Sequence, residues 1–245
     1  MDPQGQLGKV LGAKPHSARR SALNLLLDAI LEQEPVGAES DAGAAKTLPT
    51  RAELPVIPSR IAKLDLILAH KALGLAPAFG GDDPDPTGRL ERRLAAAPEL
   101  RRYDFVLLDC PPSFSALTLT VLRAVEEIVV PVPLTFLALD GCAQLTQTIQ
   151  TVRTRYGCSE LRITMVVPTF YRRTRLAHEV LERLKQRFPK EIAQTVIGFH
   201  VKIDEAQSRG LSVFEYAPRD RGASALAALA EELEARRPVA EGEAR

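Results

Sequence analysis

The chain has 245 residues, 45% of them hydrophobic, which is enough to bury the core of one large α/β domain or of two small ones. Its 32 Lys and Arg residues nearly balance 31 Asp and Glu residues, which leaves a net charge of +1. This balance excludes a protein drawn to nucleic acid by its overall charge, so such binding must come from a local basic patch.

The cysteines and the hydropathy pattern indicate the cellular compartment. Cys110, Cys142 and Cys158 show neither C-x-x-C nor metal-ligand spacing, which favours reduced thiols used as small apolar side chains. The N-terminus lacks a basic-then-apolar signal region, and no apolar run approaches the roughly 18 residues of a membrane span. We therefore expect a cytoplasmic protein without a membrane segment.

The first hundred residues have weak patterns. Apolar residues at helical spacing predict a helix over residues 21–32, and the small and polar residues of 36–50 and 80–88 predict loop insertions. Between these loops, residues 54–57 predict a short strand that leads into a helix over 59–73. Two loops so close together indicate an elaborated peripheral region rather than a domain boundary.

From residue 103 onward, short apolar runs alternate with helical patterns. The runs are FVLLD (105–109), EIVVPV (127–132), LRITMVV (161–167) and TVIG (195–198), and helices are predicted over 117–124, 137–156, 175–188 and 223–236. Runs that are apolar on both faces are typical of a parallel sheet covered by helices. The alternation predicts one doubly wound α/β domain over 1–237, with a mostly parallel sheet, helices on both faces and a disordered tail at 238–245.

Two features of this second half suggest chemistry. Asp109 ends an apolar run, at the edge where open α/β sheets bind ligands, and its carboxylate is suited to hold Mg²⁺; a cap or turn Asp gives the same pattern. Basic residues also crowd into one predicted helix and its leading loop, where they would neutralise phosphates without reading bases; a solvated helix face is the alternative. They are Arg172, Arg173, Arg175, Arg183, Lys185 and Arg187, opposed by Glu179 and Glu182.

Several stretches, in order, resemble the ParA/MinD family of deviant Walker ATPases, and specifically its ParA/Soj branch, which positions chromosomes and plasmids. They are MDPQG (1–5), YDFVLLDCPPSFSALTLTVL (103–122), VPVPLTFLALDGCAQL (130–145), RRTRLAHEVLERL (172–184) and VKIDEAQSRGLSVFEYAPRDRGASA (201–225). The resemblance implies a P-loop NTPase-like fold, ATP and Mg²⁺ as cofactors, and an ATP-sandwiched homodimer. It also implies nonspecific DNA and a ParB-like protein as partners, and association with the nucleoid.

The resemblance implies catalytic and metal roles for matching residues. Asp2 corresponds to the aspartate that positions the attacking water and the metal, and Asp109 to the Walker B aspartate. Pro111 and Pro112, with Ser113, correspond to the switch that senses the γ-phosphate.

The resemblance also implies binding roles. Arg173 and Lys202, with Arg172 and Arg175 beside them, fall at positions whose basic residues grip DNA in the family. Three further residues, Pro168, Gly198 and His200, fall near the adenine, where the family has a polar residue, Pro and Asn. His200 is also readable as an ordinary loop histidine.

One family motif is missing from the printed sequence. In the family, Asp-Pro-Gln-Gly follows a first strand, a glycine-rich phosphate loop, a helix and a second strand, whereas here it stands at residues 2–5, and G-x-x-x-x-G-K-[ST] occurs nowhere. The chain is therefore expected to bind ATP poorly or not at all by itself. Either its first residue is an internal methionine of a longer gene, the alternative we favour, or it is a degenerate member that has repacked its sheet or borrowed a strand.

The leading hypothesis is a ParA-type partition protein, and the alternative is a nucleotide-independent module that binds DNA or a partner protein. A MinD-like membrane protein is disfavoured because the C-terminal helix is acidic through its middle. A metal hydrolase or thiol enzyme is disfavoured because no histidine has ligand spacing and no Cys pairs with a His in a motif.

Overall fold

The computed structural model describes residues 11, 22–26, 54–70, 73, 83–111 and 115–236. The chain divides into two compact units, Met1–Val125 and Glu126–Arg245, each of which is described here by itself. All three cysteines are free thiols, and Cys142 is buried. Within the described residues, no helix combines the length and the apolar character that crossing a membrane requires.

The first unit consists of short helices around a small core. The 3₁₀ helices are η2 (Ala22–Leu25), η5 (Pro86–Gly88) and η6 (Pro98–Arg102), the α-helices are α2 (Arg89–Ala95) and α3 (Ala116–Arg123), and the strands are β1 (Ile57–Pro58) and β2 (Asp65–Leu66). Leu73 and Leu90 are fully buried, and they pack with Leu117 and Val121 of α3. The predicted helix over 117–124 is thus confirmed as α3, whose N-terminal Thr118 amide donates to the Ser115 hydroxyl.

Arginines of α2 and α3 anchor the described end of the predicted 80–88 loop. The Arg123 guanidinium donates to both carboxylate oxygens of Asp85, at 2.5 and 2.7 Å. Asp83 Oδ2 accepts from Arg89 and Arg92 at 2.9 and 2.7 Å. The hydrogen bonds from Arg123 lower the pKa of Asp85 from 3.8 to about 2. Residues 83–88 are therefore tied to α2 and α3.

Two predictions for residues 54–70 are wrong. Residues 59–70 form no helix, because Ser59–Leu64 is a turn with Lys63 in a left-handed conformation (φ 64°), followed by β2, which pairs antiparallel with β1. Leu66 and Leu68 are both buried, and this spacing of two is that of a strand. Of the strand predicted at 54–57, only Ile57 is in a strand, β1. Of the helix predicted over 21–32, only 22–26 lie among the described residues.

The run FVLLD is also not a strand. Residues 103–111 are extended, but no described strand pairs with them, and Phe105, Val106 and Leu107 are 40, 47 and 77% exposed. A β-strand exists only where its backbone N–H and C=O groups find a partner, which the apolar pattern alone cannot supply. The extended backbone of this run was therefore predicted correctly, but its pairing with a neighbouring strand was not.

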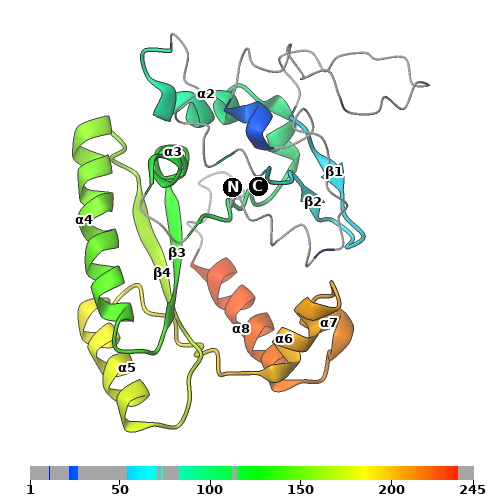
Figure 1. Cartoon of the computed structure of the whole chain (residues 1–245), viewed down its shortest axis with the longest axis vertical. Coiled ribbons are helices and arrows are strands. Elements are labelled where there is room, and N and C mark those ends of the chain that lie inside the picture. Colours follow the sequence, from blue (N-terminus) through cyan, green and yellow to red (C-terminus); the bar gives the residue numbers. More distant parts are fainter. Residues whose placement is uncertain are drawn as a thin grey trace, which may run out of the picture. The chain divides into compact units, whose positions relative to one another are not determined.

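The second unit is the α/β part of the chain (Figure 1). Parallel strands β3 (Glu127–Pro133) and β4 (Arg162–Thr169) are joined by α4 (Ala138–Tyr156) and followed by α5 (Arg175–Arg187), α6 (Val201–Ser208), α7 (Val213–Tyr216) and α8 (Arg221–Ala235). Both strands and the helices α4, α5 and α8 were predicted within two residues of their ends. TVIG was predicted as a strand but makes only an isolated bridge, Tyr171 to Gly198.

Strand β4 is covered on both of its faces. Val166 packs in a core with side chains of α4 and α5, whereas Met165 and Val167 pack with Leu226 and Leu229 of α8. Figure 1 shows α4 and α5 on one side of the strands and α8 on the other. This is the doubly wound arrangement that the alternation of strands and helices predicts. The apolar face of α8 is buried against β4 within the second unit.

The end of α8 is tied to the segment that follows α5. The Glu232 carboxylate accepts from the backbone amides of Gln194 and Thr195, at 2.8 and 2.9 Å. Arg236 donates to Glu232 and to three backbone carbonyls, of which those of Glu191 and Ile192 are both at 2.7 Å. These bonds satisfy backbone groups of residues 191–195, which belong to no strand, and the Thr164 carbonyl of β4, where the register with β3 is irregular.

Candidate functional site

The chain segments after β4 and before α6 lie side by side. The Tyr171 amide donates to the Ile197 carbonyl at 3.1 Å, and the Phe199 amide donates to the Tyr171 carbonyl at 3.2 Å. This pairing brings the basic residues that follow Tyr171 next to the N-terminus of α6, where Lys202 lies. We call the surface formed by residues 170–175 and 198–202 the carboxyl-edge surface, because β4 ends at it.

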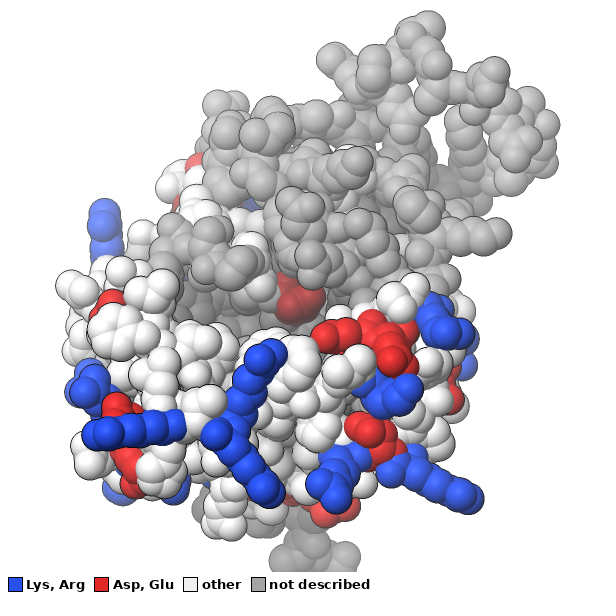
Figure 2. Space-filling model, turned by 60° about the horizontal axis from the view of Figure 1, so that its bottom comes forward, with Lys and Arg blue, Asp and Glu red and all other residues white. Residues whose placement is uncertain are grey.

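The cations of the carboxyl-edge surface differ in whether they form ion pairs with neighbouring carboxylates. Arg173 is exposed and has no ion-pair partner among the residues that the structure describes. Arg175 pairs with Glu179 at 2.8 Å along α5. Lys202 Nζ lies 2.7 Å from the Glu205 carboxylate, and this hydrogen bond raises the pKa of Lys202 and lowers that of Glu205. In Figure 2, Lys and Arg side chains spread over this side of the molecule, with acidic side chains among them.

The helix α5 divides the basic cluster seen in the sequence. Arg175 begins the helix and Arg187 ends it, so about 18 Å of helix separates them at 1.5 Å per residue. Lys185, in the last turn, pairs with Glu182 at 2.8 Å. Only Arg172, Arg173 and Arg175 therefore belong to the carboxyl-edge surface, and the other three cations lie toward the far end of α5.

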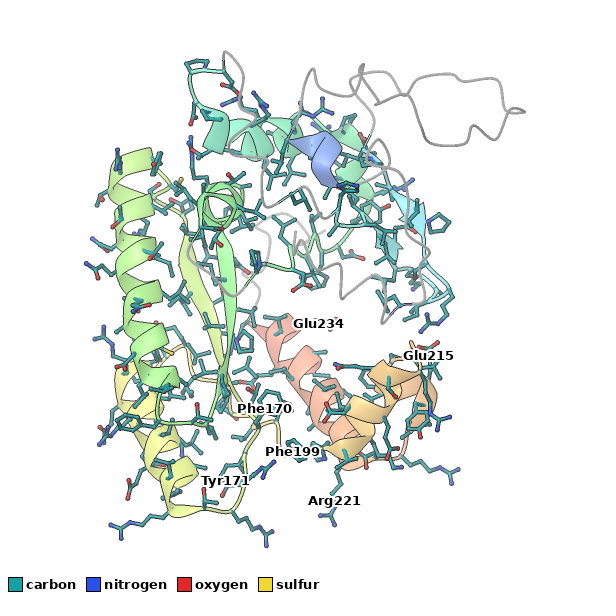
Figure 3. All side chains as sticks on the ribbon, viewed as in Figure 1. Phe170, Tyr171, Phe199, Glu215, Arg221 and Glu234 are labelled. Atoms are coloured by element: carbon teal, nitrogen blue, oxygen red, sulfur yellow. The ribbon has the colours of Figure 1, made fainter. Side chains whose placement is uncertain are left out.

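Two exposed aromatic rings lie within this surface, and sequence reasoning missed them. Phe170 and Phe199 are 55 and 41% exposed, and their ring centroids are 6.4 Å apart at an angle of 41°. The Arg172 guanidinium lies over the Phe199 ring, 4.3 Å from its centroid. Figure 3 shows both rings where the strands end. The available signal was the mixture of aromatic and basic residues in TFYRRTR and GFHVK.

Of the three residues proposed near the adenine, Gly198 and His200 belong to the carboxyl-edge surface and Pro168 lies beside it. The Pro168 carbonyl accepts from the Ile197 amide at 2.9 Å, which places it against Gly198. The His200 ring fills the space that a Cβ on Gly198 or Gly222 would enter, 3.1 and 3.0 Å from those positions. His200 thus has a packing contact between two backbone segments.

Comparison with known proteins identifies the chain's relatives. A family model described as an AAA domain matches residues 1–163. Over 236 residues the chain is 31% identical to the sporulation initiation inhibitor protein Soj of Bacillus subtilis, covering 96% of this chain and 84% of that protein. It is 40% identical over 160 residues to the chromosome-partitioning ATPase Soj of Thermus thermophilus, covering 62% and 64% of the two chains. The chain belongs to the ParA/MinD family.

Solved structures give this ParA/MinD chain the α/β fold of P-loop NTPases. Cobyrinic acid a,c-diamide synthase from Mycobacterium smegmatis is 25% identical and superimposes with a TM-score of 0.67, over 94% of this chain and 78% of that one. The same synthase was solved with bound ADP and magnesium. A related site in this chain would need carboxylates that hold magnesium beside the nucleotide's phosphates.

The described part of this ParA/MinD chain does not by itself fit a Mg²⁺–nucleotide site. Asp109 is exposed at the end of the extended FVLLD segment, and Pro111 after it is half-buried. Among the described residues, no three His, Cys, Asp or Glu side chains cluster closely enough to hold a metal ion. Asp2 and Pro112 lie outside the described residues. The structure therefore lays the segments of Arg173 and Lys202 side by side, whereas of the two proposed catalytic residues it describes only Asp109.

Proposed function

We propose that the chain is a partitioning protein of the ParA/Soj type that binds DNA without sequence preference through its carboxyl-edge surface. The observation that carries the proposal is the backbone pairing of Tyr171 with residues 197–199, because it sets Arg173 beside the segment of Lys202. Two relatives are named as Soj proteins, one of them as a chromosome-partitioning ATPase. Cations on adjacent segments suit a phosphate backbone, which they neutralise without reading bases.

In this proposal the surface works in a nucleotide-dependent homodimer, and a ParB-like protein stimulates ATP hydrolysis. A second candidate is DNA binding that ignores nucleotide. It requires only the carboxyl-edge surface, whose residues 170–175 and 198–202 all lie among the described residues. The two candidates share the DNA surface and differ in whether ATP and Mg²⁺ change its affinity.

Fluorescence anisotropy with a labelled duplex of random sequence tests both candidates. The logarithm of affinity should fall linearly with the logarithm of salt concentration, and Arg173→Ala should reduce that slope by about 1. Arg187→Ala is the matched control, since it removes the same charge from the far end of α5. Equal losses in the two variants, or affinity independent of salt, would contradict the proposed surface.

Addition of ATP and Mg²⁺ to the same titration separates the candidates. Affinity unchanged by nucleotide, together with a constant molecular mass in light scattering, would support the nucleotide-independent module. Affinity that rises with ATP as the mass doubles would support the ATP-dependent dimer.

A further inference from the structure

Binding of phosphates by cations does not explain why two aromatic rings of the carboxyl-edge surface are exposed. The ring centroids of Phe170 and Phe199 are 6.4 Å apart, and about half of the surface of each residue is exposed to solvent. Water contact with so much aromatic surface is unfavourable unless a partner covers it. The rings sit among cations, so the partner should present negative charge together with flat apolar groups.

The backbone at Phe170 supports a role for the ring rather than a packing accident. Phe170 has φ 53°, in the left-handed region that bulky side chains rarely adopt. Its ring is 55% exposed, so burial does not offset this strain. Strained residues of this kind cluster at binding sites, where the surrounding structure holds them in place.

The geometry around Phe199 favours stacking of a planar group. The Arg172 guanidinium carbon already lies 4.3 Å from the ring centroid, so a planar cation and a planar ring are in contact here and form one unit. Nucleobases stack on aromatic rings and on guanidinium planes in the same way. A base in a duplex has both faces covered by its neighbours, so only an unpaired base can stack on this unit.

We propose that the carboxyl-edge surface binds single-stranded DNA, with unpaired bases stacked on Phe170 and Phe199 and phosphates held by Arg173 and Lys202. This inference rests on the proposed DNA-binding function and specifies its substrate. The charge of the surface favours a nucleic acid over an apolar protein segment, since a protein partner would need its own acidic groups to match the cations.

The test uses three labelled ligands of equal length, about 20 nucleotides each: an oligothymidine, a strand of abasic sites, and a duplex. The whole chain should bind the oligothymidine about 5- to 10-fold more tightly than the abasic strand, because both carry the same phosphates and only one has bases. Phe170→Ala and Phe199→Ala should each remove most of that preference and leave binding to the abasic strand unchanged. Phe199→Tyr, which keeps the ring, should restore it.

Two controls keep this outcome separate from that of the proposed function. Phe214→Ala removes a ring of 50% exposure from α7 and should leave all three affinities unchanged. Arg173→Ala should weaken binding to all three ligands. If the chain binds the abasic strand as tightly as the oligothymidine and both Phe variants bind like the parent, base stacking is refuted while DNA binding stands. If none of the three ligands binds, the proposed function fails as well.

Discussion

The ion pair between Asp85 and Arg123 should make the first unit sensitive to acid. The Arg123 side chain is 9% exposed and donates to both oxygens of Asp85, so Asp85→Asn leaves a buried guanidinium without its main charge partner. The pKa of Asp85 falls from 3.8 to about 2 through these hydrogen bonds. A pKa lowered on folding means that the carboxylate stabilises the fold above pH 3.8, and that this stabilisation is lost as pH falls toward 2.

The size of the effect follows from the shift and from solvent exposure. A shift of 1.8, from 3.8 to about 2, corresponds to at most ~2.4 kcal/mol. The Asp85 side chain is 42% exposed, so solvent screening reduces this to about 1 kcal/mol. We therefore expect Asp85→Asn to lower the free energy of unfolding by about 1 kcal/mol at neutral pH.

Urea denaturation followed by circular dichroism measures this loss at neutral pH and again near pH 2. The difference between parent and variant should shrink in acid, where Asp85 is protonated in both folded and unfolded chains. The double variant with Arg123→Met supplies the control, because the loss from Asp85→Asn should largely disappear once its partner is absent. A loss that is equal at both pH values, or additive with Arg123→Met, would refute the reasoning.

Three further changes have distinct expected outcomes. Arg236→Met removes a guanidinium that donates to three backbone carbonyls and to Glu232, and should lower the unfolding free energy by about 2 kcal/mol in the same urea assay; an unchanged midpoint would contradict the tie between α8 and residues 191–195. Glu205→Gln frees Lys202 from its carboxylate partner and should strengthen duplex binding about two- to fivefold in anisotropy at low salt, whereas weaker binding would exclude Lys202 from the surface. Phe170→Gly relieves the left-handed strain and should not lower the melting temperature, yet should weaken oligothymidine binding; a lower melting temperature would mean that the ring supports the fold.

Prediction from the sequence succeeded for elements whose apolar pattern directly reflects which of their faces are buried. The middle of strand β4, residues 165–167, is apolar because both faces of the strand are covered, and α4 and α5 repeat their apolar residues over several turns. The run 105–109 is equally apolar, but its strand state depends on a pairing partner, and residues 59–70 were misread because the spacing of Leu66 and Leu68 is that of a strand.

The candidate site could be predicted only in part, for a similar reason. The family resemblance pointed to Arg173 and Lys202 through their positions in motifs, and the structure lays their two segments side by side. The pairing of Phe170 with Phe199 has no local signal, since it arises from tertiary contact between distant segments. The mixture of aromatic and basic residues around each ring was a local signal of an exposed surface, but it does not show that the two rings meet.

Hydrogen exchange of backbone amides, measured with and without DNA, tests the central claim most directly. The account predicts that DNA slows exchange at residues 170–175 and 198–205, and leaves α4 and the last turn of α5 unchanged. Protection centred on α4 or on the first unit, with none at the carboxyl-edge surface, would contradict it.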